Sequence, residues 1–263
     1  MRDNPALKTL YTSLQRKNYV LFLDETYDSE GSMKAPAFYI VSGVLIKADH
    51  LAQTRQDIRE IVRSNYWHST EALQTSQGQR TAVKLLEYCS EVKDTYFISH
   101  KSHVHQKPLE HARRDCIKAL LKSCQTEVSG LKAIIIESQQ KRSFDDWDRS
   151  TVRQMKQNKD LPREVAFMSV SPYQEPLLWL PDLVALSYRR SLTHSDTTSH
   201  YYKQYLAKST IVLTGDKAGM FKRNTQLPLF DHGNYLDEIH NPLSHPTDQD
   251  LALEITEHNE QEL

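Results

Sequence analysis

The chain has 263 residues, of which 38% are apolar and 25% are charged. This length suits one large domain or two small ones, and the charged fraction is ordinary for a folded protein, which excludes a wholly disordered chain. The apolar runs are shorter than the roughly 18–20 residues of a membrane helix, and no apolar segment follows the N-terminus as a secretory signal requires. We therefore expect a cytoplasmic protein.

The formal net charge of −1 is the sum of a basic region and an acidic C-terminal region. Nine acidic residues and no Lys or Arg lie between Asp231 and Leu263. Because the chain has 34 acidic residues, residues 1–230 keep 25 of them beside all 33 basic residues, a net charge of +8. This charge is compatible with a polyanionic partner, and solvated basic helix faces explain it equally well. We expect one domain over residues 1–230, with a C-terminal extension from about residue 199, and an acidic, flexible tail over residues 231–263.

Several common chemical motifs are absent from the sequence. With only seven glycines, the chain has no Gly-rich phosphate loop, and it has no Gly-x-Ser-x-Gly turn for a nucleophilic serine. The cysteines Cys89, Cys116 and Cys124 are odd in number and fall in helical patterns, so we expect buried free thiols rather than a disulfide or zinc framework.

The first part of the chain predicts two strands, two helices and a third strand. Residues 19–26 contain the apolar run Val-Leu-Phe-Leu, which fits a strand buried on both faces. A short turn-rich segment separates it from a second apolar strand over residues 37–47, which predicts an antiparallel hairpin. The remaining elements of this part are helices over residues 49–64 and 79–92 and a strand over residues 95–101.

The second part alternates between helices and strands. The predicted elements are a helix over residues 109–128, a strand over 131–138, a helix over 144–159, a strand over 164–170 and a helix over 176–192. Because a proline in a helix interior loses a hydrogen bond, the last helix is expected to kink or begin afresh at Pro181. A short helix over residues 200–208 and a strand-like piece over residues 210–214 follow.

This order predicts an α/β fold with a mixed five-stranded sheet, helices on both faces, and a helical insertion between the second and third strands. In such sheets functional residues collect at the carboxyl ends of the strands. The carboxyl ends of the first and fourth strands are therefore the places to look for chemistry.

Three acidic residues stand beside apolar runs, where a carboxylate is costly unless a cation or hydrogen bonds compensate it. Asp24 ends the apolar run of the first strand, Glu137 ends that of the fourth, and Asp182 lies within the apolar helix over residues 176–192. Taken singly, each acid fits a solvated strand end or a helix cap. Together they predict a site for Mg²⁺ or Mn²⁺, because hard cations take oxygen ligands. Two such ions would activate a water and steady the leaving oxygen of a phosphodiester.

The same residues carry a resemblance to a known family. The segment Phe-Leu-Asp-Glu-Thr over residues 22–26, with the apolar strand over residues 38–46, resembles the opening of the domain-of-unknown-function 3800 family, which typically has Asp-Glu-Ser-Gly after its first strand. The segment over residues 175–185, Glu-Pro-Leu-Leu-Trp-Leu-Pro-Asp-Leu-Val-Ala, is similar to its closing helix. The resemblance spans about residues 18–192 and implies a ribonuclease H-like fold.

The resemblance also implies which residues form the site. It places metal-binding carboxylates at Asp24, Glu137 and Asp182, and it adds Glu25 to the site region, although strand alternation directs Glu25 to the opposite face from Asp24. His68 and Glu71 resemble a polar segment of the family and stand as auxiliary ligands or a proton shuttle, with a solvated loop as the alternative.

The sequence also departs from the family pattern. Thr26 and Tyr27 stand where Ser-Gly is usual, Pro181 replaces a small residue, and Glu137 is longer than an aspartate. These departures bear on activity more than on the fold.

We therefore hypothesise a metal-dependent nuclease that cleaves phosphodiester bonds of DNA or RNA, in mobile-element or antiphage defence. Lys101, Lys141 and Arg142 are candidate phosphate contacts, with solvated surface as the equal alternative. A catalytically silent nucleic-acid-binding or protein-interaction module on the same fold is the rival hypothesis. A restriction-type nuclease core is disfavoured because the lysine of its Glu-x-Lys motif is missing after Glu137.

Overall fold

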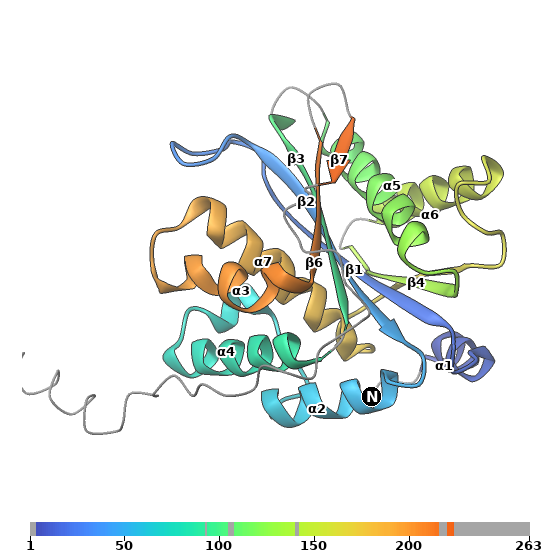
Figure 1. The fold of residues 1–263 in the computed structure, drawn as a ribbon, viewed down its shortest axis with the longest axis horizontal. Coiled ribbons are helices and arrows are strands. Elements are labelled where there is room, and N and C mark those ends of the chain that lie inside the picture. Colours follow the sequence, from blue (N-terminus) through green and yellow to red (C-terminus); the bar gives the residue numbers. More distant parts are fainter. Residues whose placement is uncertain (1–3, 93, 105–107, 140–141, 216–219, 224–263) are drawn as a thin grey trace, which may run out of the picture. The chain divides into compact units, whose positions relative to one another are not determined.

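A computed structural model describes residues 4–92, 94–104, 108–139, 142–215 and 220–223 of the chain. Within Met1–Leu227, a single sheet organises the described residues (Figure 1). The acidic tail expected over residues 231–263 lies outside the described residues, so its properties stay a prediction.

The sheet has seven strands in the spatial order β5-β4-β1-β2-β3-β6-β7. The strands are β1 Tyr19–Asp28, β2 Phe38–Lys47, β3 Thr95–Ser102, β4 Leu131–Glu137, β5 Ala166–Val170, β6 Thr210–Gly215 and β7 Phe221–Arg223. The predicted count of five was wrong, because β6 pairs parallel with β3 and β7 pairs antiparallel with β6. The three-residue β7 is too short to carry a periodic signal, whereas β6 coincides with the strand-like piece in the sequence.

The sheet mixes antiparallel and parallel pairs, as the element order predicted. The β1–β2 hairpin is antiparallel, and β3 continues that pattern beside β2. On the other side of β1, β4 and β5 run parallel to it. The β1–β4 pairing ends at Leu23 and Ile136, while β1 continues beside β2 to Asp28. The carboxyl ends of β1 and β4 therefore lie at the same end of the sheet, and β1 extends past the end of β4.

Seven α-helices are found among the described residues. They are α1 Pro5–Ser13, α2 Leu51–Val62, α3 Ser69–Ala72, α4 Ser76–Glu91, α5 Leu109–Glu127, α6 Arg142–Gln157 and α7 Trp179–Thr193. Three helices, rather than the two predicted, connect β2 and β3, since the short α3 forms within a segment whose polar sequence gave no helical period. Short non-α helical turns fill the region between α7 and β6, namely η3 Thr197–His200, η4 Tyr202–Leu206 and η5 Ala207–Ser209.

Alternate residues of β1 enter two separate apolar cores, because successive side chains of a strand point to opposite faces. Val20 and Phe22 belong to the core shared with α2, α4 and α7, and Leu21 and Leu23 to the core shared with α5 and α6. Figure 1 shows α7 and α5 on opposite sides of the sheet. Helices therefore cover both faces, as expected, and the polar residues that follow along β1 inherit the same alternation.

The prediction for the cysteines is confirmed, since Cys89, Cys116 and Cys124 are buried free thiols within helices. Burial raises the pKa of each thiol to about 12, so these groups stay protonated near neutral pH. In the ranges that the structure covers, no helix is both long enough and apolar enough to cross a membrane.

Candidate functional site

Asp24 and Glu137 lie on adjacent parallel strands and share one face of the sheet. Leu23 of β1 pairs with Ile136 of β4, and both belong to the core on the α5 side. The next residue of each strand therefore turns to the opposite face, which α7 covers. The parallel register thus places the carboxylates of Asp24 and Glu137 at neighbouring positions on the face of the sheet that α7 covers.

Asp182 reaches this place from the first turn of α7. Ser42, the pairing partner of Asp24 on β2, contacts the carbonyl oxygen of Pro181 at 2.7 Å and that of Asp24 at 3.3 Å. The Ser69 amide donates to Oδ2 of Asp182 at 2.7 Å. Pro181 is tolerated because its N–H would have no helical partner in the first turn. The Pro176–Leu178 turn precedes α7, so the expected restart occurs at Trp179 rather than at Pro181.

The charges of these acids interact. Burial raises the pKa of Asp24, and the negative charges of Glu137, Glu25 and Asp182 raise it further. Burial and then Asp182 and Glu25 raise the pKa of Glu137 to about 7. Burial and the charge of Glu71 raise the pKa of Asp182, while the hydrogen bonds from Ser69 and the nearby His68 act against this. Each carboxylate is held where full ionisation is unfavourable, a property common at functional sites.

The donor chemistry of the three carboxylates fits a hard divalent cation such as Mg²⁺ or Mn²⁺. In the arrangement that the structure shows, no three His, Cys, Asp or Glu side chains among the described residues are close enough together to hold a metal ion. The Asp24, Glu137 and Asp182 side chains would have to rotate to share one ion, and Asp182 would do so against its hydrogen bond from Ser69.

Glu25 lies on the other face of the sheet, as strand alternation predicted. It forms an ion pair with Arg113 of α5, which also donates to both carboxylate oxygens of Asp148 of α6 at 2.9 and 2.7 Å. Arg113 further donates to the Tyr39 hydroxyl at 3.1 Å. These buried groups join β1, β2, α5 and α6, so Glu25 anchors the backbone next to Asp24 from the α5 face of the sheet. The charge of Glu25 acts on Asp24 from that opposite face.

His68 and Glu71 lie at the rim of the site. His68 directly precedes α3, and its Nδ1 is 3.9 Å from Oε1 of Glu71. His68 faces Asp182 closely enough to lower its pKa. Glu71 is mostly exposed and accepts a hydrogen bond from the Tyr66 hydroxyl at 3.2 Å. The structure therefore brings His68 near Asp182, whereas Glu71 contacts an aromatic residue and acts on Asp182 only through its charge.

The cations beside the site are not those that the sequence suggested. Lys101 is buried and ion-paired with Asp115 of α5, which removes it as a phosphate contact. Lys141 and the side chain of Arg142 lie outside the described residues. Instead, Arg189 of α7 donates to Oγ1 of Thr26 at 3.1 Å, two residues along β1 from Asp24.

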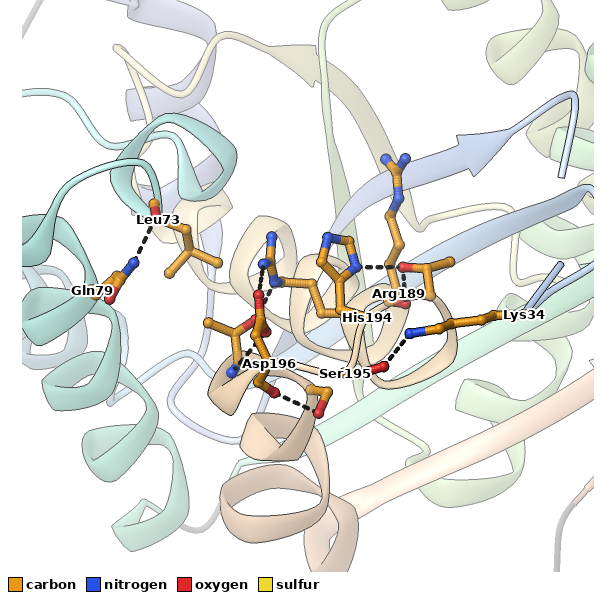
Figure 2. Close-up of polar contacts among 11 residues, drawn as sticks. Lys34, Leu73, Gln79, Arg189, His194, Ser195 and Asp196 are labelled. Atoms are coloured by element: carbon orange, nitrogen blue, oxygen red, sulfur yellow. Dashed lines mark hydrogen bonds and ion pairs between the residues drawn. The ribbon is translucent and has the colours of Figure 1, made fainter. Parts of the chain in front are cut away.

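Further basic residues gather at the end of α7. Figure 2 shows Lys34 and His194 there together with Arg189, with Lys34 hydrogen-bonded to Ser195. Burial and the positive charges of Arg190, Arg189 and Lys34 lower the pKa of His194. Sequence reasoning missed this group because its members come from a turn and a helix end far apart in the chain.

A stacked aromatic pair joins the loop before α3 to the loop after β5. Tyr66 stacks on Tyr173 with ring centroids 4.8 Å apart and an angle of 16° between the ring planes. From the sequence, Tyr66 and Tyr173, together with Tyr27 and Trp67, are candidates for stacking on bases, with a place in the core as the alternative. Trp67, the neighbour of Tyr66, is instead buried, with its indole N–H donating to Ser69.

Comparisons with known proteins give structural neighbours only. No protein-family profile and no curated protein sequence matches the chain. Among solved structures, the chain is similar to Bst-RNase HIII in complex with Mn²⁺, with a TM-score of 0.43 and 13% identity over 71% of this chain and 56% of that one. Ribonuclease H2 from Pyrococcus horikoshii OT3 has a TM-score of 0.42 and 14% identity over 71% and 88% of the two chains. RNase HII of the PCNA complex from Archaeoglobus fulgidus has a TM-score of 0.42 and 13% identity over 72% and 88%.

Proposed function

We propose that this protein is a metal-dependent nuclease of the domain-of-unknown-function 3800 family, with a ribonuclease H-like fold, that hydrolyses phosphodiester bonds of nucleic acid. The single observation that carries the proposal is the convergence of Asp24, Glu137 and Asp182, from β1, β4 and α7. Burial raises the pKa of all three, and the charges of neighbouring site carboxylates raise those of Asp24 and Glu137 further. Mutual repulsion of this kind is relieved when a cation binds.

Asp24, Glu137 and Asp182 would hold Mg²⁺ or Mn²⁺, which would supply an activated water and stabilise the charge that develops on the phosphate. The remaining roles belong to the chain. Ser42 and Ser69 hold α7 and the Asp182 carboxylate in place against β1. His68 is positioned to carry a proton at the rim. Arg189, with Lys34 and His194 beside it, is positioned to contact a phosphate of the strand.

A catalytically silent nucleic-acid-binding module is the second candidate, and one observation favours it. The Ser69 amide already satisfies one oxygen of Asp182, and within the described ranges no three side chains of metal-binding type are grouped for an ion. The carboxylates would then be neutralised by protons rather than by a metal. Binding of nucleic acid by such a module would respond to salt and ignore Mg²⁺.

Calorimetric titration of Mn²⁺ and Mg²⁺ into the protein decides between the candidates. We expect binding at micromolar to millimolar affinity, abolished by Asp24→Asn and by Asp182→Asn, with circular dichroism showing that both variants remain folded. Glu30→Gln, which changes an exposed carboxylate in the β1–β2 turn, is the matched control and should bind as the unchanged protein does. Binding indifferent to both site substitutions would overturn the metal-site assignment.

Cleavage is then measured on end-labelled single- and double-stranded DNA and RNA with each metal. Metal-dependent products that both Asn variants fail to form would support the nuclease. Metal binding without cleavage of any of these substrates, together with salt-dependent nucleic-acid binding, would favour the silent module.

A further inference from the structure

The stacked Tyr66–Tyr173 pair joins two loops that both carry residues of the site. Tyr66 lies three residues before Ser69, whose amide holds Asp182. Tyr173 lies three residues after Val170, which pairs with Glu137 in the sheet. Burial and the charge of Glu71 raise the pKa of Tyr66, and the charge of Asp182 adds a smaller contribution, so the Tyr66 hydroxyl feels Asp182 of the site. The pair therefore joins two loops that carry site residues and lies within electrostatic reach of Asp182.

The pair is accessible and fixed in orientation. Tyr173 keeps 55% of its surface exposed, although an aromatic side chain gains by burial. The Tyr66 ring is held from one side by Tyr173 and at its hydroxyl by Glu71 at 3.2 Å. The Tyr173 amide in turn bonds to Oγ of Ser171 at 3.3 Å. An exposed ring that is already ordered loses little conformational entropy when a flat ligand stacks on it.

We infer that the Tyr66–Tyr173 pair is a stacking site for an unpaired nucleobase, so that the preferred substrate of the proposed nuclease is single-stranded nucleic acid. This inference rests on the proposed function and adds the substrate class. Every base presents a flat face, and successive bases of single strands stack on exposed aromatic side chains in many binding proteins. In a duplex those faces are covered by neighbouring base pairs, so only an unpaired base can use the pair.

The charges around the site agree with a strand that crosses it. The Tyr66–Tyr173 pair belongs to the loops before α3 and after β5, whereas Arg189 contacts Thr26, two residues along β1 from Asp24. With one base stacked on Tyr173, the sugar-phosphate backbone of the strand would run past the carboxylates. It would continue towards Arg189 and the basic residues at the end of α7, which Figure 2 shows. The arrangement also gives Glu71 a role, because its carboxylate accepts the Tyr66 hydroxyl bond and orients that ring, while its charge also acts on Asp182.

Fluorescence anisotropy with labelled oligonucleotides of about 12 nucleotides, a typical length for such sites, tests the inference. The probes are an oligothymidylate, an oligouridylate, a strand of abasic residues and a duplex, each measured with EDTA and again with Mg²⁺ after a gel confirms that the strand is intact. Comparison of the first two probes distinguishes DNA from RNA. The abasic strand keeps the phosphates and removes the bases.

Tyr173→Ala is expected to weaken binding of the base-bearing single strands about 5- to 100-fold. It should leave binding of the abasic strand and of the duplex unchanged. Tyr173→Phe keeps the ring and should bind as the unchanged protein does. Tyr27→Ala is the matched control. Tyr27 is 47% exposed and stacks on Tyr39 with ring centroids 5.5 Å apart, but it lies on the same face of β1 as Glu25, away from the site.

Two results would overturn the inference. One is equal binding of the base-bearing strands by Tyr173→Ala and the unchanged protein, including no binding by either. The other is a loss that the abasic strand or Tyr27→Ala shows to the same extent. Failure of the proposed function is seen separately, in calorimetric metal binding, which Tyr173→Ala should retain in full and Asp24→Asn should lose.

Discussion

At the scale of single residues, the site acids are expected to oppose folding when no metal is bound. Asp24 is buried beside Glu137 and Asp182, and all three pKa values are raised. A carboxyl whose pKa rises on folding does not destabilise the folded state at a pH below its unfolded-state pKa. The free energy of unfolding falls as the pH rises from that value through the folded-state pKa. Asp24→Asn is therefore expected to raise the free energy of unfolding at pH 8 by on the order of 1–3 kcal/mol.

The measurement is urea denaturation at pH 8 and pH 4.5 with EDTA, and again with Mn²⁺. The gain from Asp24→Asn should shrink at pH 4.5, because that pH is close to the unfolded-state pKa of about 3.9 and the buried carboxyl is protonated in the folded state. With Mn²⁺ at about 100 times its dissociation constant, the unchanged protein should gain about 2.7 kcal/mol and the variant nothing. A variant that is less stable than the unchanged protein at pH 8 without metal would contradict the electrostatic account.

Asp94, which precedes β3, gives a second prediction that is independent of the site. Burial raises its pKa to about 6, and its Oδ2 is buried without a hydrogen-bond partner among the described residues. The folded state thus holds the proton more tightly than the unfolded chain does, and stability falls as the pH rises from about 4 through 6. Asp94→Asn should stabilise the protein at pH 7 by about 2–3 kcal/mol.

The same substitution should have almost no effect at pH 3.5, where Asp94 is protonated in both states. Thermal melts at the two pH values measure the difference, with the exposed Glu30→Gln as a control that should change neither. An equal gain at both pH values would show that packing or propensity, rather than the charge, is responsible.

A residue's role could be predicted from the sequence where it depends on neighbouring residues in the chain, and not where it depends on contacts between distant segments. The two-residue period of a strand predicts that Asp24 and Glu25 point to opposite faces. In the structure, Phe22 and Leu23 enter opposite cores, and Glu25 pairs with Arg113 on the α5 face. The partner of Glu25, Arg113, could not be named, because it comes from a helix whose register against the sheet is set by packing. The stacking of Tyr66 on Tyr173 depends in the same way on two distant loops meeting.

At the scale of elements, the start of α7 is fixed by one buried ion pair. Glu175 is fully buried and accepts two hydrogen bonds from Arg55 of α2, each of 2.9 Å. It also accepts from the Tyr11 hydroxyl of α1 at 2.5 Å and from the Leu177 amide. These contacts join α1 and α2 to the turn that aims Asp182 at the site.

Arg55→Ala should therefore destabilise the protein by about 3–5 kcal/mol, because it leaves the Glu175 charge buried without its cation. Urea denaturation measures the loss, and Arg80→Ala, an exposed arginine of α4, should cost less than about 0.5 kcal/mol. The double variant Arg55→Ala, Glu175→Gln should recover part of the loss, since it removes the unpaired charge. No recovery would indicate that lost packing over the Tyr11 ring, 5.0 Å from the guanidinium, dominates.

Elements with strong periodicity were predictable, and short ones were not. The five long strands appear close to their expected ranges, because continuous apolar runs have few other solutions. β7 and α3 have three and four residues, too few for a period, and they form where neighbouring elements supply their partners. Pro181 was expected to interrupt a helix, but the Pro176–Leu178 turn moves the helix start so that the proline falls in the first turn.

At the scale of the whole molecule, the charge of the chain is divided between two regions of the sequence. Residues 1–230 carry a net charge of +8, and the nine carboxylates of residues 231–263 reduce it to −1. Attraction of a polyanion depends on the summed charge near its binding surface and weakens steeply with salt. If the proposed function holds, we expect the tail to compete with nucleic acid for the basic side chains of residues 1–230.

Deletion of residues 231–263 should strengthen binding of an oligothymidylate about tenfold or more at low salt, and the gain should fall as salt rises, because counterion release supplies it. Anisotropy titrations across a salt series measure both effects. A chain in which the nine tail carboxylates are changed to Asn and Gln keeps the length and should behave as the deletion does. If it binds as the unchanged protein while the deletion binds more tightly, the tail blocks by its bulk. If neither change affects binding, the tail charge has no part in recognition, and the positive charge of residues 1–230 is solvated helix surface.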